Sequence, residues 1–118
     1  MKRVPVLIGA LELSAVLDSG STRSLLNEAV CRRLQVTPSR SFLKLVGANG
    51  QPLENMGEVS VEITVDRQSF KQTFVVVPHL KEELLLLGDD FLRQSKAFID
   101  WGTNSFSVQT EKPLKVYA

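Results

Sequence analysis

Hydrophobic and polar residues alternate along most of this chain, which is the pattern of half-buried β-strands. In segment 11–17, Leu11, Leu13 and Ala15 alternate with polar residues, and segment 58–65 repeats that period. Shorter apolar runs occupy 4–8, 41–46, 70–77, 84–87, 97–101, 105–108 and the tail at 113–118. Turn-forming residues separate these runs at 9–10, 18–21, 49–50, 66–69 and 102–104. The pattern predicts a mainly β domain in which consecutive strands form hairpins.

Two segments have helical spacing instead. Segment 24–34 places its apolar residues near one face, with Glu28 in an early turn, and Thr22 or Ser24 precedes it as a candidate N-cap. Negative charge and small hydroxyls are both favoured at a helix start. A short helical turn is expected at 91–95.

Composition and charge exclude several classes of function. The 118 residues (13.1 kDa) suit one domain, 1–118, and a net charge of +1 gives no general reason to bind nucleic acid or an anionic membrane. Cys31 is the only cysteine and His79 the only histidine. No zinc-type spacing therefore exists, and a Ser-His-Asp triad would depend on His79 alone. We expect no metal and no cofactor. No secretory signal or membrane span is recognisable, so a cytoplasmic location is expected.

The most informative stretch is Asp18-Ser19-Gly20-Ser21, at the exit of an apolar strand. Small residues and a glycine let backbone approach the Asp18 carboxylate closely, and hydroxyls beside it can donate hydrogen bonds to its charged form. Taken alone, the stretch also fits a solvated turn in which Asp18 caps the following helix. It lacks the Gly-Lys-Ser/Thr ending of a phosphate-binding loop.

A second stretch, Leu85-Leu86-Leu87-Gly88-Asp89-Asp90, lies about 70 residues downstream, beyond the Asn49-Gly50 hairpin signal. With both stretches in this order, the chain resembles the retropepsins, the aspartic proteases of retroviruses and retrotransposons. The segments 97–101 and 106–108 are similar to the end of proteases from gypsy-type retroelements and their domesticated relatives. The resemblance covers roughly 4–108. It implies a small, closed, β-barrel-like fold with a flap hairpin and one short helix in the C-terminal half, assembled as a homodimer.

The resemblance also implies residue roles. Asp18 matches the catalytic aspartate, Ser19 the residue that braces the two active-site loops across the dimer axis, and Gly20 the glycine whose carbonyl contacts substrate. Ser21 completes this loop, and 47–51 matches the flap tip. The residues expected to contact substrate are Val16, Thr22, Leu25, Gly47, Ala48, Asn49, Gly50, Leu84 and Leu86.

Two departures from the retroviral pattern concern charge. Many retroviral enzymes carry an acidic residue where Thr22 stands and an arginine where Asp89 stands, whereas here Arg23 lies near the first position and Asp89-Asp90 at the second. Recognition of substrate backbone at that end of the groove is therefore expected to differ.

The implied chemistry needs two carboxylates sharing one proton, of which one activates water and the other polarises the scissile carbonyl. The chain has one Asp-Ser-Gly motif, so the partner carboxylate must come from a second copy. The chain ends, 1–6 and 113–118, are candidates for pairing between copies. The expected function is thus that of a homodimeric aspartic endopeptidase that processes a retroelement-type polyprotein, in the cytoplasm or within retroelement particles. The alternative is a domesticated, catalytically silent module for dimerisation or protein interaction.

The remaining expectations are structural. Cys31 is read as a buried small hydrophobe, Trp101 as a core packing residue, His79 as a loop residue and Arg32-Arg33 as a solvated helix face. If Ser21 donates a hydrogen bond to Asp18, Ser21→Ala should move the acidic limb of the rate profile toward higher pH.

Overall fold

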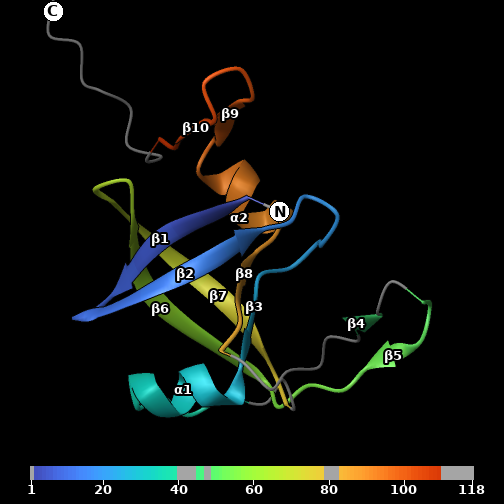
Figure 1. Cartoon of the computed structure of the whole chain (residues 1–118). Helices are drawn as coiled ribbons and strands as arrows, with labels where there is room; N and C mark the ends of the chain where they lie inside the picture. Colours follow the sequence, from blue (N-terminus) through green and yellow to red (C-terminus); the bar gives the residue numbers. More distant parts are fainter. Residues whose placement is uncertain (1, 40–44, 47–48, 79–82, 110–118) are drawn as a thin grey trace, which may run out of the picture.

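The protein folds around a closed six-stranded β-barrel (Figure 1). The computed structural model describes residues 2–39, 45–46, 49–78 and 83–109. The barrel strands are β1 (Arg3–Ile8), β2 (Leu11–Leu17), β3 (Leu25–Asn27), β6 (Glu58–Val65), β7 (Gln68–Val77) and β8 (Leu85–Leu87). Their order around the barrel is β1-β2-β8-β3-β7-β6. The predicted mainly β fold is confirmed.

Two tight hairpins supply the four long strands. Gly9 has a φ of +61° in the β1–β2 turn, where Ile8 pairs with Leu11. Asp66 and Arg67 both have positive φ between β6 and β7, as a two-residue primed turn requires. This turn is two residues shorter than the predicted 66–69 because Gln68 already pairs with Val65.

The helix predicted over 24–34 is wrong in its first turn. Leu25 and Leu26 belong to β3, which pairs in parallel with β7 and antiparallel with β8. Helix α1 therefore begins at Glu28 and spans Glu28–Leu34. The side chain of Asn27 accepts a hydrogen bond from the Val30 N–H, so Asn27 is the N-cap in place of Thr22 or Ser24.

A second helix, α2 (Asp89–Gln94), occupies the predicted helical turn and is the short helix expected in the C-terminal half. The Asn49-Gly50 signal is confirmed, because a turn containing Gly50 (φ +79°) joins β4 (Leu45–Val46) to β5 (Pro52–Leu53). The predicted hairpin near the end of the chain is also present, as β9 (Phe98–Asp100) and β10 (Ser105–Ser107). Of the strand expected over 41–46 only Leu45 and Val46 are described, and His79 and 113–118 lie outside the described residues.

The barrel interior is apolar and closely filled. Phe74 and Phe91 are fully buried, and the Phe91 ring meets Phe70 edge to face, with centroids 5.2 Å apart and an interplanar angle of 79°. Phe91 belongs to α2, so this helix is anchored by an aromatic side chain inside the barrel. The same packing fixes the segment that immediately precedes α2.

Trp101 is not a core residue, contrary to the prediction. Its exposed fraction is 77%, and that of Phe98 is 64%. The β9–β10 hairpin forms a separate two-stranded sheet that protrudes from the barrel, and Ile99 and Phe106 are the residues of these two strands that pack against the core (Figure 1). The side chains on the other face of the hairpin therefore remain at the surface.

The expectations for Cys31 and for Arg32-Arg33 on α1 are confirmed. Cys31 is 3% exposed within the core, and Arg32 and Arg33 lie on the solvent face, where Arg33 forms an ion pair with Glu83. Among the described residues, no helix has the length and apolarity needed to span a membrane.

Replacing Asn27 by alanine should remove the α1 cap and lower the free energy of unfolding by about 1–2 kcal/mol. The matched control is Thr22→Ala, an exposed candidate cap that the structure leaves outside the helix, for which a change within about 0.5 kcal/mol is expected. Urea unfolding followed by circular dichroism measures both variants. Equal losses for the two would contradict the assignment of the cap.

Burial raises the pKa of the Cys31 thiol above its ordinary value of 9.0, and the charge of Glu28 raises it further. The folded chain thus keeps a proton that the unfolded chain releases. Stability should fall as the pH rises above about 9, and native Cys31 should resist iodoacetamide at pH 8 while reacting in guanidinium. Mass spectrometry after timed alkylation checks this, and rapid native labelling would contradict the buried position.

Candidate active site

Asp18 lies at the point where two parallel strands leave the barrel side by side. Val16 pairs with Leu86 and Leu17 with Leu87 in the parallel ladder between β2 and β8. The Asp18 N–H then donates to the Leu87 carbonyl at 3.0 Å, which extends the ladder by one residue. The loop after β2 and the Gly88-Asp89 segment after β8 therefore start from the same edge of the sheet.

Backbone groups orient the Asp18 carboxylate. The Gly20 N–H donates to Asp18 Oδ1 at 2.9 Å, and the Ser21 N–H donates to the Asp18 carbonyl at 3.1 Å. A Cβ on residue 20 would lie 3.2 Å from Asp18 Oδ1, so the loop closes tightly around the half-buried carboxylate. Because Asn27 caps α1, the alternative reading of Asp18 as the helix cap is wrong.

Ser21 does not act on Asp18 in the way expected from the sequence. Its hydroxyl donates to the Arg23 carbonyl at 2.8 Å. A hydroxyl has one proton to donate, so this bond leaves none for the carboxylate. The expected effect of Ser21→Ala on the acidic limb therefore loses its physical basis, and Ser21 instead stabilises the return of the loop toward β3.

Gly88 lets the two loops touch. A Cβ at this position would lie 2.6 Å from the Arg23 carbonyl oxygen and 2.7 Å from that of Ser21. The neighbouring Asp89 N–H donates to the Ser21 carbonyl at 2.7 Å. The active-site loop thus packs directly on the backbone that opens α2.

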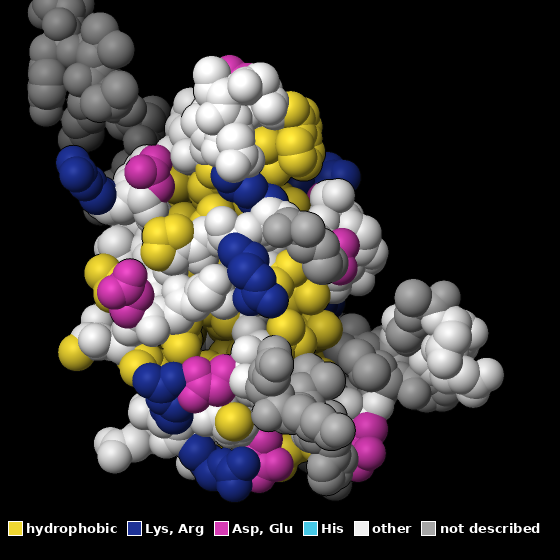
Figure 2. Space-filling model, viewed as in Figure 1, with side chains coloured by type: hydrophobic (Ala, Val, Ile, Leu, Met, Phe, Trp, Pro, Cys, Tyr) yellow, Lys and Arg dark blue, Asp and Glu magenta, His cyan; other side chains and the backbone are white. Residues whose placement is uncertain are grey.

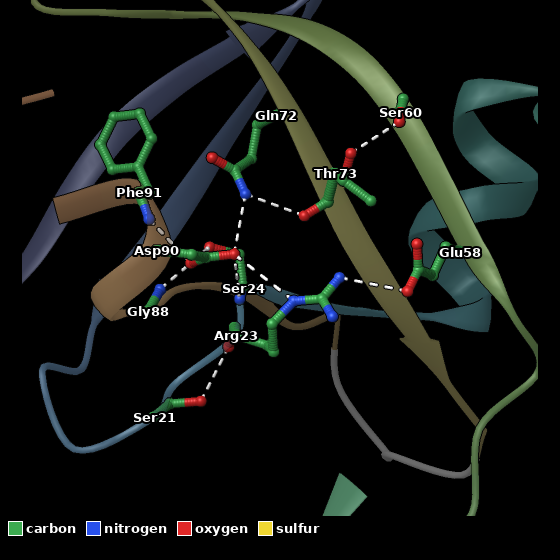
Figure 3. Close-up of polar contacts among 10 residues, drawn as sticks. All are labelled: Ser21, Arg23, Ser24, Glu58, Ser60, Gln72, Thr73, Gly88, Asp90 and Phe91. Atoms are coloured by element: carbon green, nitrogen blue, oxygen red, sulfur yellow. Dashed lines mark hydrogen bonds and ion pairs between the residues drawn. The ribbon is translucent and has the colours of Figure 1, made fainter. Parts of the chain in front are cut away.

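The Asp90 carboxylate stabilises this contact through hydrogen bonds to buried residues (Figure 3). Its Oδ1 accepts from Ser24 Oγ at 2.6 Å, and its Oδ2 accepts from the Ser24 N–H at 3.0 Å and from Gln72 Nε2 at 3.0 Å. Ser24 Oγ in turn accepts from the Gly88 N–H at 3.0 Å. Ser24 and Gln72 are buried, so these bonds form away from competing water.

The charge departures seen in the sequence have a structural outcome. Arg23 faces Glu58 and Asp90, while Asp89 points outward and pairs with Arg93 along α2. Arg23 and Asp89 therefore do not pair with each other, as they would if the acidic residue and the arginine of the retroviral enzymes had simply exchanged places. Thr22 is exposed.

Three of the residues expected to contact substrate lie in one row across the sheet. Val16 pairs with Leu86, and Leu86 with Leu25, which in turn faces Val75 on β7. None of these belongs to the main core cluster, whereas the neighbouring row formed by Leu17, Leu87, Leu85 and Leu26 does. The first row thus lies on the sheet face that looks away from the barrel interior.

The other expected site residues are more dispersed. Leu84 is half-buried and its carbonyl accepts from the Asn27 N–H at 3.2 Å, next to the row of Val16. Ser19 and Gly20 are exposed at the tip of the active-site loop, and Asn49 and Gly50 are exposed in the β4–β5 turn. Gly47 and Ala48 lie outside the described residues.

Sequence reasoning missed Ser24, Glu58, Gln72 and Asp90 as members of the site. Gln72 carried one signal, because it stands between Phe70 and Phe74 at an inward-facing position of β7. A buried polar side chain requires a partner. Nothing in the linear pattern indicates that its partner is Asp90, 18 residues away. Within the described part of the chain, no three His, Cys, Asp or Glu residues are grouped as a metal site would need.

Residues 4–94 match the model of a family described as gag-polyprotein putative aspartyl protease. The chain belongs to this family. No curated protein sequence matches it significantly. Its fold is that of the retropepsins, which confirms the resemblance seen in the sequence.

Two solved structures illustrate the likeness. The retroviral protease-like domain of Ddi1 from Leishmania major superposes with a TM-score of 0.71 and 21% identity, over 90% of this chain and 84% of that one. EIAV protease complexed with the inhibitor HBY-793 superposes with a TM-score of 0.63 and 25% identity, over 78% of this chain and 85% of that one.

Gly88→Ala should push the active-site loop away from α2, because the added Cβ meets backbone that cannot rotate aside. We expect a loss of about 1–3 kcal/mol in unfolding free energy. Gly102→Ala is the control, since its Cβ would meet only the half-buried Asp100 side chain, at 3.3 Å, and a change within about 0.5 kcal/mol is expected. Chemical denaturation measures both, and a neutral Gly88→Ala would refute the close approach.

Proposed function

We propose that this domain is an aspartic endopeptidase whose active site is completed by a second copy of the chain. The observation that carries the proposal is the placement of Asp18, a half-buried carboxylate held by the Gly20 N–H at the exit of β2 in a retropepsin-like barrel. The family description supports a gag-type polyprotein as the class of substrate.

The reaction would use Asp18 from both copies as a pair sharing one proton. The charged carboxylate removes a proton from a water molecule while the water oxygen bonds to the scissile carbonyl carbon. The protonated carboxylate donates to the carbonyl oxygen, which stabilises the tetrahedral intermediate. Collapse of that intermediate returns the carbonyl, transfers a proton to the amide nitrogen and breaks the C–N bond. The pair ends with one proton, ready for another turnover.

The second copy is needed because Asp18 is the only aspartate of the chain in an Asp-Ser-Gly motif. One edge of the N-terminal strand is occupied within the chain, since all six residues of β1 pair with β2. The expected partner segment, 113–118, lies outside the described residues.

The β9–β10 hairpin is the better candidate for the contact between copies. It lies beyond α2, at the same end of the barrel as the loop after β2 and opposite α1 (Figure 1). Lys2 Nζ donates to the Asn104 carbonyl at 2.7 Å, which ties the hairpin to the start of β1. Phe98 and Trp101 expose a large apolar area on this protrusion (Figure 2). A second copy that covered both side chains would remove that area from water and bring a second Asp18 nearby.

The row of Val16, Leu86 and Leu25 would line the substrate groove beside the paired aspartates. Its apolar side chains suit hydrophobic residues of an extended peptide. The exposed Thr22 side chain is uncharged, so it offers no ion pair to a charged residue of that peptide. The β4–β5 hairpin would cover the bound peptide as the flap.

Asp18→Asn should abolish peptide cleavage while leaving the fold intact, because amide side chains cannot exchange the proton that both chemical roles require. A loss of about a hundredfold or more is expected. Asp66→Asn is the matched control, since Asp66 sits exposed in the β6–β7 turn with a positive φ that asparagine also tolerates.

The wild type, Asp18→Asn and Asp66→Asn are each incubated with a mixed peptide library, and mass spectrometry measures the cleavage products. Turnover retained by Asp18→Asn would refute the catalytic assignment. A folded, dimeric wild-type protein that cleaves nothing would favour the alternative of a silent interaction module.

Trp101→Ala should weaken association of the two copies by about 30-fold or more, as is typical of a central interface tryptophan. The specific activity of the variant should then fall on dilution at protein concentrations where the specific activity of the wild type is still constant. The control is Leu7→Ala, an exposed apolar residue of β1, which belongs to the barrel and not to the hairpin. Sedimentation equilibrium gives the dissociation constants, and an unchanged constant for Trp101→Ala would exclude the hairpin as the interface.

A further inference from the structure

Three charged side chains link parts of the chain that meet at the active site (Figure 3). Arg23 Nη2 donates to Glu58 Oε1 at 3.2 Å, and Arg23 Nε lies 3.8 Å from Asp90 Oδ2. Arg23 belongs to the active-site loop, Asp90 to α2 and Glu58 to the first position of β6. These three residues are called the Arg23 bridge below.

Glu58 marks the base of the β4–β5 hairpin. β5 ends at Leu53, and the chain then enters β6 through Gly57, whose φ is +112°. The base is fixed by backbone hydrogen bonds from Glu58 N–H to the Ser39 carbonyl, at 2.7 Å, and from Met56 N–H to the Val76 carbonyl, at 2.8 Å. Glu58 therefore belongs both to the base of the hairpin and to the barrel strand β6.

The bridge crosses β7. Val75 pairs with Glu58 on one side and with Leu25 on the other, and its N–H donates to the Ser24 carbonyl at 3.0 Å. The Arg23 side chain thus spans from the segment entering β3, past β7, to the start of β6. No backbone ladder joins β3 directly to β6, because β7 lies between them.

Arg23 is the central residue of the Arg23 bridge because it is the positive charge between two carboxylates. One guanidinium serves two carboxylates, and the three side chains are only 23–26% exposed, which limits screening by water. Asp90 is additionally held by Ser24, Gln72 and the Phe91 N–H. The Asp90 end of the bridge is therefore firmly placed in α2, and the Glu58 end lies at the base of the β4–β5 hairpin.

We infer that the Arg23 bridge couples the base of the β4–β5 hairpin to the active-site loop, which makes Arg23 a positioning residue for substrate binding. The part of this inference that concerns substrate rests on the proposed protease function. The physical coupling between the two segments does not, and it can be measured without any substrate.

The first test is amide hydrogen exchange by NMR in Glu58→Gln, which removes the charge at the hairpin end. The Ser24 and Gly88 amides, at the far end, should exchange about three- to tenfold faster relative to amides in the centre of the β6–β7 ladder. Arg23→Gln should accelerate exchange at both ends. Arg93→Gln is the matched control, because it removes an arginine that is 81% exposed and pairs only along α2.

Coupling is overturned if Glu58→Gln alters only the Glu58 and Ser39 amides and leaves those of Ser24 and Gly88 at their wild-type rates. It is equally overturned if Arg93→Gln produces the same changes as Arg23→Gln, since the effect would then reflect net charge alone.

The second test is kinetic and uses the same variants in the dimeric protein. Arg23→Gln should raise KM by about three- to tenfold with kcat within about twofold, and Arg23→Gln with Glu58→Gln should be no worse than Arg23→Gln alone. A lower kcat at unchanged KM would indicate a loss of folded enzyme and would refute the positioning role. A wild type that cleaves nothing would refute the proposed function, whereas the exchange experiment would still decide the coupling.

Discussion

The contact between the loop after β2 and the segment after β8 is the constraint on which the site depends. Parallel pairing of β2 with β8 delivers both segments to one edge, and the absence of a side chain at Gly88 lets their backbones meet. Ser24 and Asp90 then close the contact with hydrogen bonds to each other. Without this docking, the loop that follows Asp18 would be a surface turn that α2 does not support.

Buried polarity is concentrated where it holds this contact. The fully buried large side chains of the barrel are almost all apolar, whereas Ser24 and Gln72 bring polar groups into the space beside Asp90. Every buried side-chain nitrogen and oxygen of the described residues has a hydrogen-bond partner. Such a network adds specificity, because a shifted loop would leave several of these groups unsatisfied at once.

The surface divides into regions with different physical roles. The β9–β10 hairpin carries the exposed aromatic residues Phe98 and Trp101, and α1, at the opposite end, presents charged side chains to solvent. Between them, the row that includes Val16 and Leu86 offers an apolar face of the sheet beside Asp18. This arrangement agrees with a domain that meets a second copy at one end and an extended chain along its side.

Local pattern was sufficient to predict most of the strands and to mark the loop of the candidate site. Alternation defined β2 and β6 to the residue, Asn49-Gly50 located the β4–β5 turn, and Asp18-Ser19-Gly20 marked the loop with the candidate catalytic carboxylate. These signals depend on neighbouring residues only, so they can be read without the fold. The same is true of Cys31, whose apolar helical neighbours already indicated burial.

Only the tertiary structure decided features that depend on residues far apart in the chain. Leu25 and Leu26 have helical spacing, yet β7 and β8 offer them ladder partners on both sides, and strand pairing prevails over local propensity. Trp101 is large and apolar, yet its hairpin stands away from the barrel, so no core space exists for it. Arg23 meets Glu58 and Asp90 across 35 and 67 positions, a distance that no periodicity spans. The sequence determined what each segment can form, and the closure of the barrel determined which side chains meet.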